Sequence, residues 1–214
     1  MKKLMLILST LLFTIFINPP INVAENNTEY LSTLIKGIEK KQKELQRETY
    51  LKNLVTEIET ESGIPIPNYV DVKYVEYIYN LAKELSLPTR MVFRLVHSES
   101  SFNDTVTSIV GARGFFQVMP GTRKLYEKRL NLSSLNLDVN SENIYIGTHL
   151  LKDLYDYWFD RGNSNNYSWR LALACYNTGI LAVINNNGVP PDEKVIDYIN
   201  FILQKPSDSY TANK

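Results

Sequence analysis

The chain has 214 residues, of which 44% are hydrophobic and 21% are charged, a composition typical of a globular protein and not of a disordered one. Its 23 basic and 23 acidic side chains balance to a formal net charge of zero, so we expect no nucleic acid as a partner. The single cysteine, Cys175, excludes an intramolecular disulfide framework. Because the whole sequence has only two histidines, His97 and His149, we expect neither a metal site nor a cofactor.

Residues 1–24 have the pattern of a secretory signal peptide, because two lysines precede an apolar run at 4–17 and an Asn-Pro-Pro breaker follows it. The run is shorter than the roughly 20 residues that a membrane span requires. Cleavage after Ala24 would put Asn22 at a poor third-last position, so an uncleaved N-terminal membrane anchor is the alternative. Either way, we expect an exported protein of the periplasm, the cell envelope or the extracellular space.

Residues 25–67 are expected to form a helical arm or spacer, which ends in a helix-breaking Ser-Gly-Ile-Pro-Ile-Pro run. Leu31, Ile38 and Leu45 fall seven residues apart, but such heptads are too few to predict a coiled coil. A partner in a membrane or envelope complex could bind the arm through residues 25–62. The sequence leaves the oligomeric state open.

From residue 68 to residue 204 the apolar side chains recur three and four positions apart, which predicts a mainly α domain, followed by a flexible tail at 205–214. A short hairpin at 107–117 is the one β element that the pattern allows. Asn140 or Ser141 would cap one of the helices, and Ser168 another. The helices are expected at 71–85, 88–100, 123–129, 140–160, 168–176 and from about 192 onwards.

Glu99 ends the apolar stripe of its predicted helix, and such a conflict with the pattern is expected mainly at functional sites. Burial against Leu95 and Val96 and the negative end of the helix dipole would both raise the pKa of its carboxyl. A raised pKa is what a general acid working near neutral pH needs. Taken alone, a glutamic acid at a helix end is more often a solvated surface acid, and this alternative is the favoured one on the local pattern.

Four separated pieces occur together in an order and spacing that resemble the catalytic domain of soluble lytic transglycosylases, the goose-type-lysozyme-like muramidases. They are Glu99-Ser100, GARGFFQVMP at 111–120, Glu142-Asn143-Ile144 with Gly147, and Ala174-Cys175-Tyr176-Asn177. The resemblance covers about residues 75–204. It implies a lysozyme-like helical fold, with Glu99 as the catalytic acid.

Members of that family cut the MurNAc–GlcNAc β-1,4 bond of peptidoglycan with one glutamic acid. It protonates the glycosidic oxygen and then takes the proton of the C6 hydroxyl, which attacks C1 and leaves a 1,6-anhydro end. For substrate binding, the resemblance implies Ser108 near the acid and the N-acetyl group, Gln117 and Met119 in the saccharide groove, Tyr176 with its hydroxyl toward the carboxyl, and Asn177. Plainer alternatives are a turn serine, core packing for Met119 and Tyr176, and a helix end for Asn177.

Two positions depart from the family pattern. Lys194 stands where relatives often carry a glutamic acid, four residues before a tyrosine that is Tyr198 here, and Phe116 replaces a methionine. Neither change removes the acid. Two other functions stay open, a hydrolysing lysozyme on the same fold, for which no second acid is clearly placed, and an inactive peptidoglycan-binding module. The setting, whether wall remodelling or a secretion, conjugation or phage apparatus, stays open too.

Overall fold

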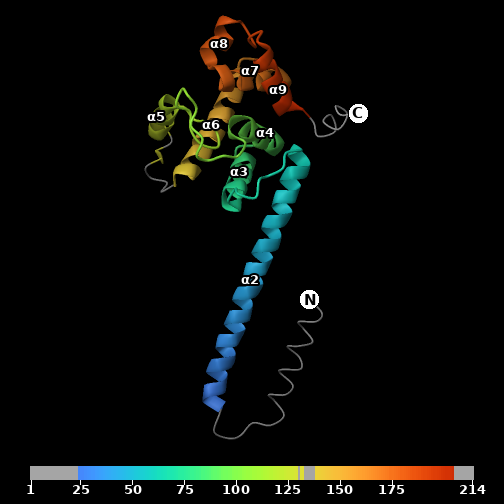
Figure 1. Ribbon diagram of the computed structural model, residues 1–214, viewed down its shortest axis with the longest axis vertical. Coiled ribbons are helices and arrows are strands. Elements are labelled where there is room, and N and C mark those ends of the chain that lie inside the picture. The colour runs from blue at the N-terminus through green and yellow to red at the C-terminus, as the bar shows by residue number, and fades with distance from the viewer. Residues whose placement is uncertain (1–23, 130, 133–137, 205–214) are drawn as a thin grey trace. The chain divides into compact units, whose positions relative to one another are not determined.

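The computed structural model describes residues 24–129, 131–132 and 138–204, and its helices are shown in Figure 1. The described residues contain no strand, and only two isolated antiparallel bridges, Thr107 with Arg113 and Arg113 with Val118, lie where the hairpin was expected. The mainly α prediction is therefore confirmed. The predicted signal or anchor and the tail fall outside the described residues. The helices are α2 (Ala24–Ser62), α3 (Val72–Glu84), α4 (Thr89–Ser100), α5 (Pro120–Arg129), α6 (Val139–Phe159), α7 (Asn165–Thr178), α8 (Ile180–Asn185) and α9 (Glu193–Leu203).

The chain divides into two compact units, residues 1–50 and residues 51–214. The described part of the first unit is the N-terminal stretch of α2, in which Tyr30 and Leu45 are each 63% exposed. In the second unit, Leu54 and Ile58 of the same helix are 4% and 1% exposed and belong to the core. None of the described helices has the length and apolar content to cross a membrane.

Helix α4 is the most buried element of the second unit, since eight of its twelve residues are buried. Its side chains pack with those of α3 and α9, and α6 and α7 complete the core. One charged residue is part of this helix interior. Arg94 is 2% exposed, and its guanidinium donates to the carbonyl oxygen of Ser62 at 2.6 Å and to that of Phe201. These bonds fix the ends of α2 and α9 against the helix that carries Glu99.

Two helices begin earlier than the sequence predicted. Asp138 caps α6, because its side chain accepts a hydrogen bond from the backbone N–H of Ser141, so the prediction of Asn140 or Ser141 was wrong. Ser164 caps α7, and the predicted cap Ser168 lies inside the helix, where its hydroxyl donates to the Ser164 carbonyl at 3.0 Å. In both cases a side-chain oxygen upstream satisfies the first free N–H groups.

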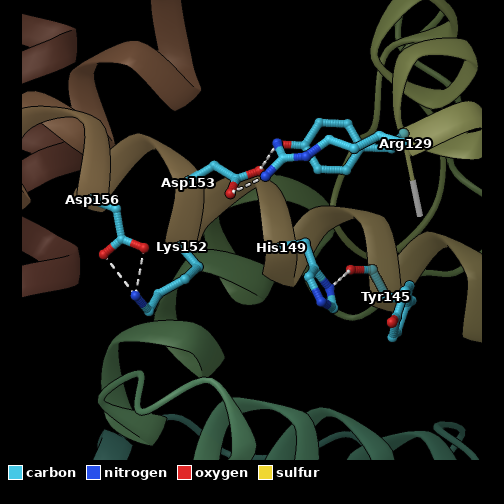
Figure 2. Close-up of polar contacts among 7 residues, drawn as sticks. Arg129, Tyr145, His149, Lys152, Asp153 and Asp156 are labelled. Atoms are coloured by element: carbon cyan, nitrogen blue, oxygen red, sulfur yellow. Dashed lines mark hydrogen bonds and ion pairs between the residues drawn. The ribbon is translucent and has the colours of Figure 1, made fainter.

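Helix α5 is attached to α6 by the carboxylate of Asp153, which Arg129 and Tyr126 share (Figure 2). Arg129 contacts both oxygens of Asp153, at 2.5 and 2.8 Å, and the Tyr126 hydroxyl donates to the same carboxylate. Lys152 and Asp156 form a second ion pair along α6. Asp153 of α6 thus holds the end of α5. The loop that precedes α5 is also bonded to α6, through Asn143.

Candidate active site

Glu99 lies in the last turn of α4, next to the residue at which the helix ends. Ser101 follows in the left-handed conformation, with φ of 50°, and its N–H closes the helix on the His97 carbonyl at 2.9 Å. Burial raises the pKa of the Glu99 carboxyl from its ordinary value of 4.5 to about 7. The carboxyl is therefore partly protonated near neutral pH.

Tyr198 of α9 is the side chain that contacts this carboxyl. Its hydroxyl donates to Glu99 Oε1 at 2.5 Å, and this bond lowers the pKa of Glu99, against the larger effect of burial. Burial and the nearby carboxylate raise the pKa of Tyr198 well above its usual value, so the phenol stays neutral and remains a donor. In the sequence analysis, Tyr198 serves only to locate Lys194, and no role is predicted for its hydroxyl. The one available signal was its place within the apolar face of the last helix.

Tyr176, predicted to approach the catalytic carboxyl, donates its hydroxyl to the carbonyl oxygen of Phe116 at 2.8 Å. The charge of Glu99, after burial, also raises the pKa of Tyr176. The two groups are thus close enough to interact electrostatically, while the hydroxyl of Tyr176 holds the neighbouring loop in place.

The loop at 113–118 is held by three helices. Ser100 of α4 donates to the Phe115 carbonyl at 2.8 Å, and Tyr176 of α7 binds the next carbonyl. From α6, Asn143 accepts the N–H of Phe116 at 2.9 Å and donates to the Arg113 carbonyl at 2.8 Å. Together with the antiparallel bridge between Arg113 and Val118, these bonds fix the backbone beside Glu99.

Two glycines let the loop come this close to α6. A Cβ on Gly147 would lie 2.3 Å from the Phe116 side chain, and a Cβ on Gly114, whose φ is +72°, would lie 2.8 Å from Asn143. Both distances are shorter than packed atoms allow, so larger residues would displace the loop. The spacing of Glu142-Asn143 and Gly147 in the sequence therefore has a packing explanation.

The remaining predicted site residues lie on or near the same loop. Gln117 has φ of 45°, and its amide nitrogen donates to the carbonyls of Val106 at 3.2 Å and Gly114 at 3.0 Å, so this side chain shapes the loop. The hydroxyl of Ser108 accepts the N–H of Ala112 at 3.0 Å, which is a turn contact.

Met119 and Asn177 are both on the surface. Met119 is 40% exposed, which leaves its thioether accessible to a ligand. Asn177 is exposed in the last turn of α7. Hydrogen bonds thus connect Gln117 and Tyr176 to the loop beside Glu99. Among the described residues, no side-chain hydrogen bond connects Ser108, Met119 or Asn177 to Glu99.

No other acid lies against the Glu99 carboxyl in the described part of the chain, and burial and the Tyr198 bond are the two causes of its pKa shift. Asp104, the other acid between Glu99 and Gln117, bonds the Asn140 amide at 2.6 Å. The described residues also contain no cluster of three or more His, Cys, Asp or Glu side chains that could hold a metal ion. The arrangement offers one buried carboxyl with one phenol donor.

A protein family described as "Transglycosylase SLT domain" matches residues 76–199, a range that contains every side chain of this site. The chain is 30% identical over 122 residues to a transglycosylase of Enterobacteria phage PRD1, which covers 53% of this chain and 44% of the phage protein. It is 31% identical over 130 residues to membrane-bound lytic murein transglycosylase C of Haemophilus ducreyi, covering 56% of this chain and 35% of that protein. The matches span less than half the length of these relatives.

Two solved structures are also similar. One is an inactive mutant of the lytic transglycosylase Slt from Pseudomonas aeruginosa, with 24% sequence identity and a TM-score of 0.49. The other is the 70 kDa soluble lytic transglycosylase of Escherichia coli, with 23% identity and a TM-score of 0.46. Each comparison covers 60% of this chain and 22% of the solved chain.

Proposed function

The chain belongs to the transglycosylase SLT domain family, and from this premise we propose that it cleaves the MurNAc–GlcNAc β-1,4 bond of peptidoglycan without adding water, leaving 1,6-anhydroMurNAc ends. Glu99 is the acid and then the base of this reaction. The single observation that carries the proposal is a buried carboxyl whose pKa is about 7, beside a neutral phenol donor. The substrate class is supported by the relative whose name specifies murein.

The first step uses the protonated form of Glu99. Near pH 7 a substantial fraction of the carboxyl carries its proton, and that proton passes to the glycosidic oxygen as the bond to C1 breaks. The leaving sugar departs with a hydroxyl, and positive charge develops at the oxocarbenium-like C1. The carboxyl becomes a carboxylate that the hydroxyl of Tyr198 stabilises.

The second step uses that carboxylate as a base. It takes the proton of the C6 hydroxyl of MurNAc, the sugar that carries C1, while the C6 oxygen bonds to C1. The acid is thereby regenerated and no water is consumed. Only one carboxyl is needed, in agreement with a site in which Glu99 has no acidic neighbour among the described residues. An ordinary glycosidase would use two carboxyl groups.

We assign the substrate contacts to the loop at 113–118 and to residues close to it in the sequence or on α7. Met119, with 40% of its surface exposed, covers an apolar sugar face, and the amide oxygen of Gln117 accepts from a sugar hydroxyl while its nitrogen holds the loop. Tyr176 positions the loop and so the groove. We assign Ser108 and Asn177 to the same groove as binding residues.

The wall substrate implies that the protein is exported, which agrees with the signal-like pattern of residues 1–24. The exposed apolar side chains of α2, among them Tyr30, Ile35 and Leu45, would serve a partner in the envelope. Deleting residues 25–50 from the exported protein should then abolish capture of that partner and leave wall cleavage in place.

The test is release of soluble fragments from purified peptidoglycan by the full chain. Glu99→Gln keeps the shape of the side chain and its contact with Tyr198 but has no proton to give, so release should fall at least about 100-fold. Glu84→Gln, an equal change at an exposed position of α3, should leave release as it is. If Glu99→Gln folds and releases fragments at the wild-type rate, Glu99 is not the acid. If the wild type binds peptidoglycan and releases nothing, the chain is a binding module.

A further inference from the structure

A cavity of about 380 Å³ lies where the end of α6, the first turns of α7 and the short helix α8 meet. Three aromatic side chains, Tyr157, Trp158 and Tyr167, are among the residues that line it. No lining residue belongs to the loop at 113–118 or bonds to it among the described residues. Along α7, Tyr167 precedes Tyr176 by nine residues, which is roughly 14 Å at the usual rise of a helix. The cavity is therefore separate from the site of Glu99, and no step of the proposed reaction uses it.

The walls of this cavity are apolar and largely aromatic. Leu171 and Val183, which are 2% and 0% exposed, form its base. The indole N–H of Trp158 donates to Cys175 Sγ at 3.2 Å, so the ring presents apolar atoms to the cavity. Tyr167 is 40% exposed, which leaves much of its ring accessible to a ligand. Such walls fit a ligand that has an apolar face.

Three neutral polar groups at the same cavity lack a partner among the described residues. The Asn163 amide nitrogen donates to the Trp158 carbonyl at 2.7 Å, which leaves Asn163 Oδ1 able to accept from a ligand. The exposed amide of Asn187 makes no side-chain hydrogen bond in the described region, and neither does the Tyr167 hydroxyl. That hydroxyl lies against the turn, since a Cβ on Gly188 would be 2.8 Å from it. No charged side chain is among the described lining residues, so the cavity fits an uncharged ligand that both donates and accepts hydrogen bonds.

We propose that this cavity is a second, non-catalytic glycan site that holds one N-acetylated sugar of the wall, an inference that rests on the proposed function. The acetamido group carries a methyl group, an N–H donor and a carbonyl acceptor, and it is uncharged. The apolar base covers the methyl group, Asn163 Oδ1 accepts from the N–H, and the Asn187 amide donates to the carbonyl. The ring of Tyr167 covers the apolar face of the sugar. A volume of about 380 Å³ is within the range of cavities that bind small molecules.

The experiment uses the full chain with Glu99→Gln, so that the ligand is not cut, and a tetramer of N-acetylglucosamine as the probe. The chain has two tryptophans, so NMR resolves two indole N–H signals. The signal of Trp158 should shift on titration and saturate, and that of Trp169, which does not line the cavity, should move less. A Trp158 signal that the probe leaves in place would overturn the proposal.

Two substitutions at the cavity and one matched control test the contacts in the same titration. Tyr167→Ala should weaken binding about tenfold, since it removes an aromatic contact. Asn187→Gly, which removes the amide and keeps the positive φ of 51° accessible, should weaken binding about fivefold. Tyr50→Ala removes an exposed tyrosine of α2 that does not line the cavity and should leave the affinity unchanged. Unchanged affinity in both cavity variants would overturn the proposal.

A second probe tests the assignment of the acetamido group. A tetramer of glucose has the same kind of ring without that group, so it should bind at least about tenfold more weakly, because the contacts of Asn163 and Asn187 are lost. A glucose tetramer that shifts the Trp158 signal with equal affinity would overturn the assignment.

Kinetics separates this inference from the proposed function. In the chain that keeps Glu99, Tyr167→Ala should raise KM for release from insoluble peptidoglycan about tenfold and leave kcat unchanged, because the cavity holds the wall and takes no part in the chemistry. Binding of the tetramer without cleavage of the wall would refute the enzymatic activity and keep the sugar site. Cleavage of the wall without a shift of Trp158 would keep the enzyme and refute the sugar site.

Discussion

Replacing Tyr198 by phenylalanine tests how the carboxyl of Glu99 is tuned. The Tyr198 hydroxyl donates to Glu99 Oε1 at 2.5 Å and lowers a pKa that burial raises to about 7. Because this donor stabilises the carboxylate more than the neutral acid, its removal raises the pKa further. A hydrogen bond to a charged group contributes about 1.5–3 kcal/mol, and 1.36 kcal/mol corresponds to one pKa unit. The pKa of Glu99 should therefore rise to about 8 or 9 in Tyr198→Phe.

The assay is the pH dependence of kcat/KM for glycan release between about pH 5 and about pH 10. For the wild type, kcat/KM should decline above about pH 7, where the general acid loses its proton. In Tyr198→Phe the decline should begin at least about one pH unit higher. Tyr74→Phe removes a hydroxyl that donates to the Asp138 carboxylate at 3.4 Å and that does not contribute to the pKa shift of Glu99, so its kcat/KM should decline at the same pH as that of the wild type. A decline that stays in place in Tyr198→Phe, or moves to lower pH, would refute the assigned role of the hydroxyl.

Three further predictions follow from the packing of the loop and the burial of the acid. Gly147→Ala should lower the free energy of unfolding by about 1–3 kcal/mol and reduce activity, because the new Cβ meets Phe116. The control Gly121→Ala, with no atom within 4 Å of the new Cβ, should not be destabilising. Thermal melts and glycan release test both variants. Asn143→Ala should reduce kcat at least about tenfold, since it frees the Phe116 N–H, and wild-type kcat would contradict the loop assignment. Glu99→Gln should raise the melting temperature above pH 7 and leave it unchanged near pH 4. The raised pKa makes the folded state bind more protons between these values, so the stability of the wild type falls as pH rises through that window, by at most about 3 kcal/mol.

The sequence predicted a raised pKa for the Glu99 carboxyl because the signal was local. An apolar stripe at helical spacing placed Glu99 at the end of a buried helix, and burial alone was enough to predict the direction of its pKa. The partner of the carboxyl was not predictable in this way. Tyr176 lies near the end of α7 and Tyr198 in the middle of α9. Which hydroxyl reaches Glu99 depends on how α7 and α9 pack against α4, a tertiary property that spacing does not encode.

The helix ends and the short helix α8 were also hard to predict from the spacing of apolar residues. The stretch at 162–167 was expected to be loop because it is rich in asparagine and serine, yet Ser164 caps α7 and the residues that follow form its first turn. Helix α8 was not predicted, since its six residues are too few for a helical period to be visible. The role of Asn143 in holding the loop is likewise a contact between residues 27 positions apart.

The central claim is that Glu99 directs attack by the C6 hydroxyl and not by water. Mass spectrometry of the products formed in heavy-oxygen water tests it most directly. Transglycosylation predicts 1,6-anhydro ends that contain no heavy oxygen and weigh one water less than hydrolysis products, and their loss in Glu99→Gln. Reducing ends that carry heavy oxygen would contradict the claim and identify the protein as a lysozyme that activates water by a group other than those assigned here.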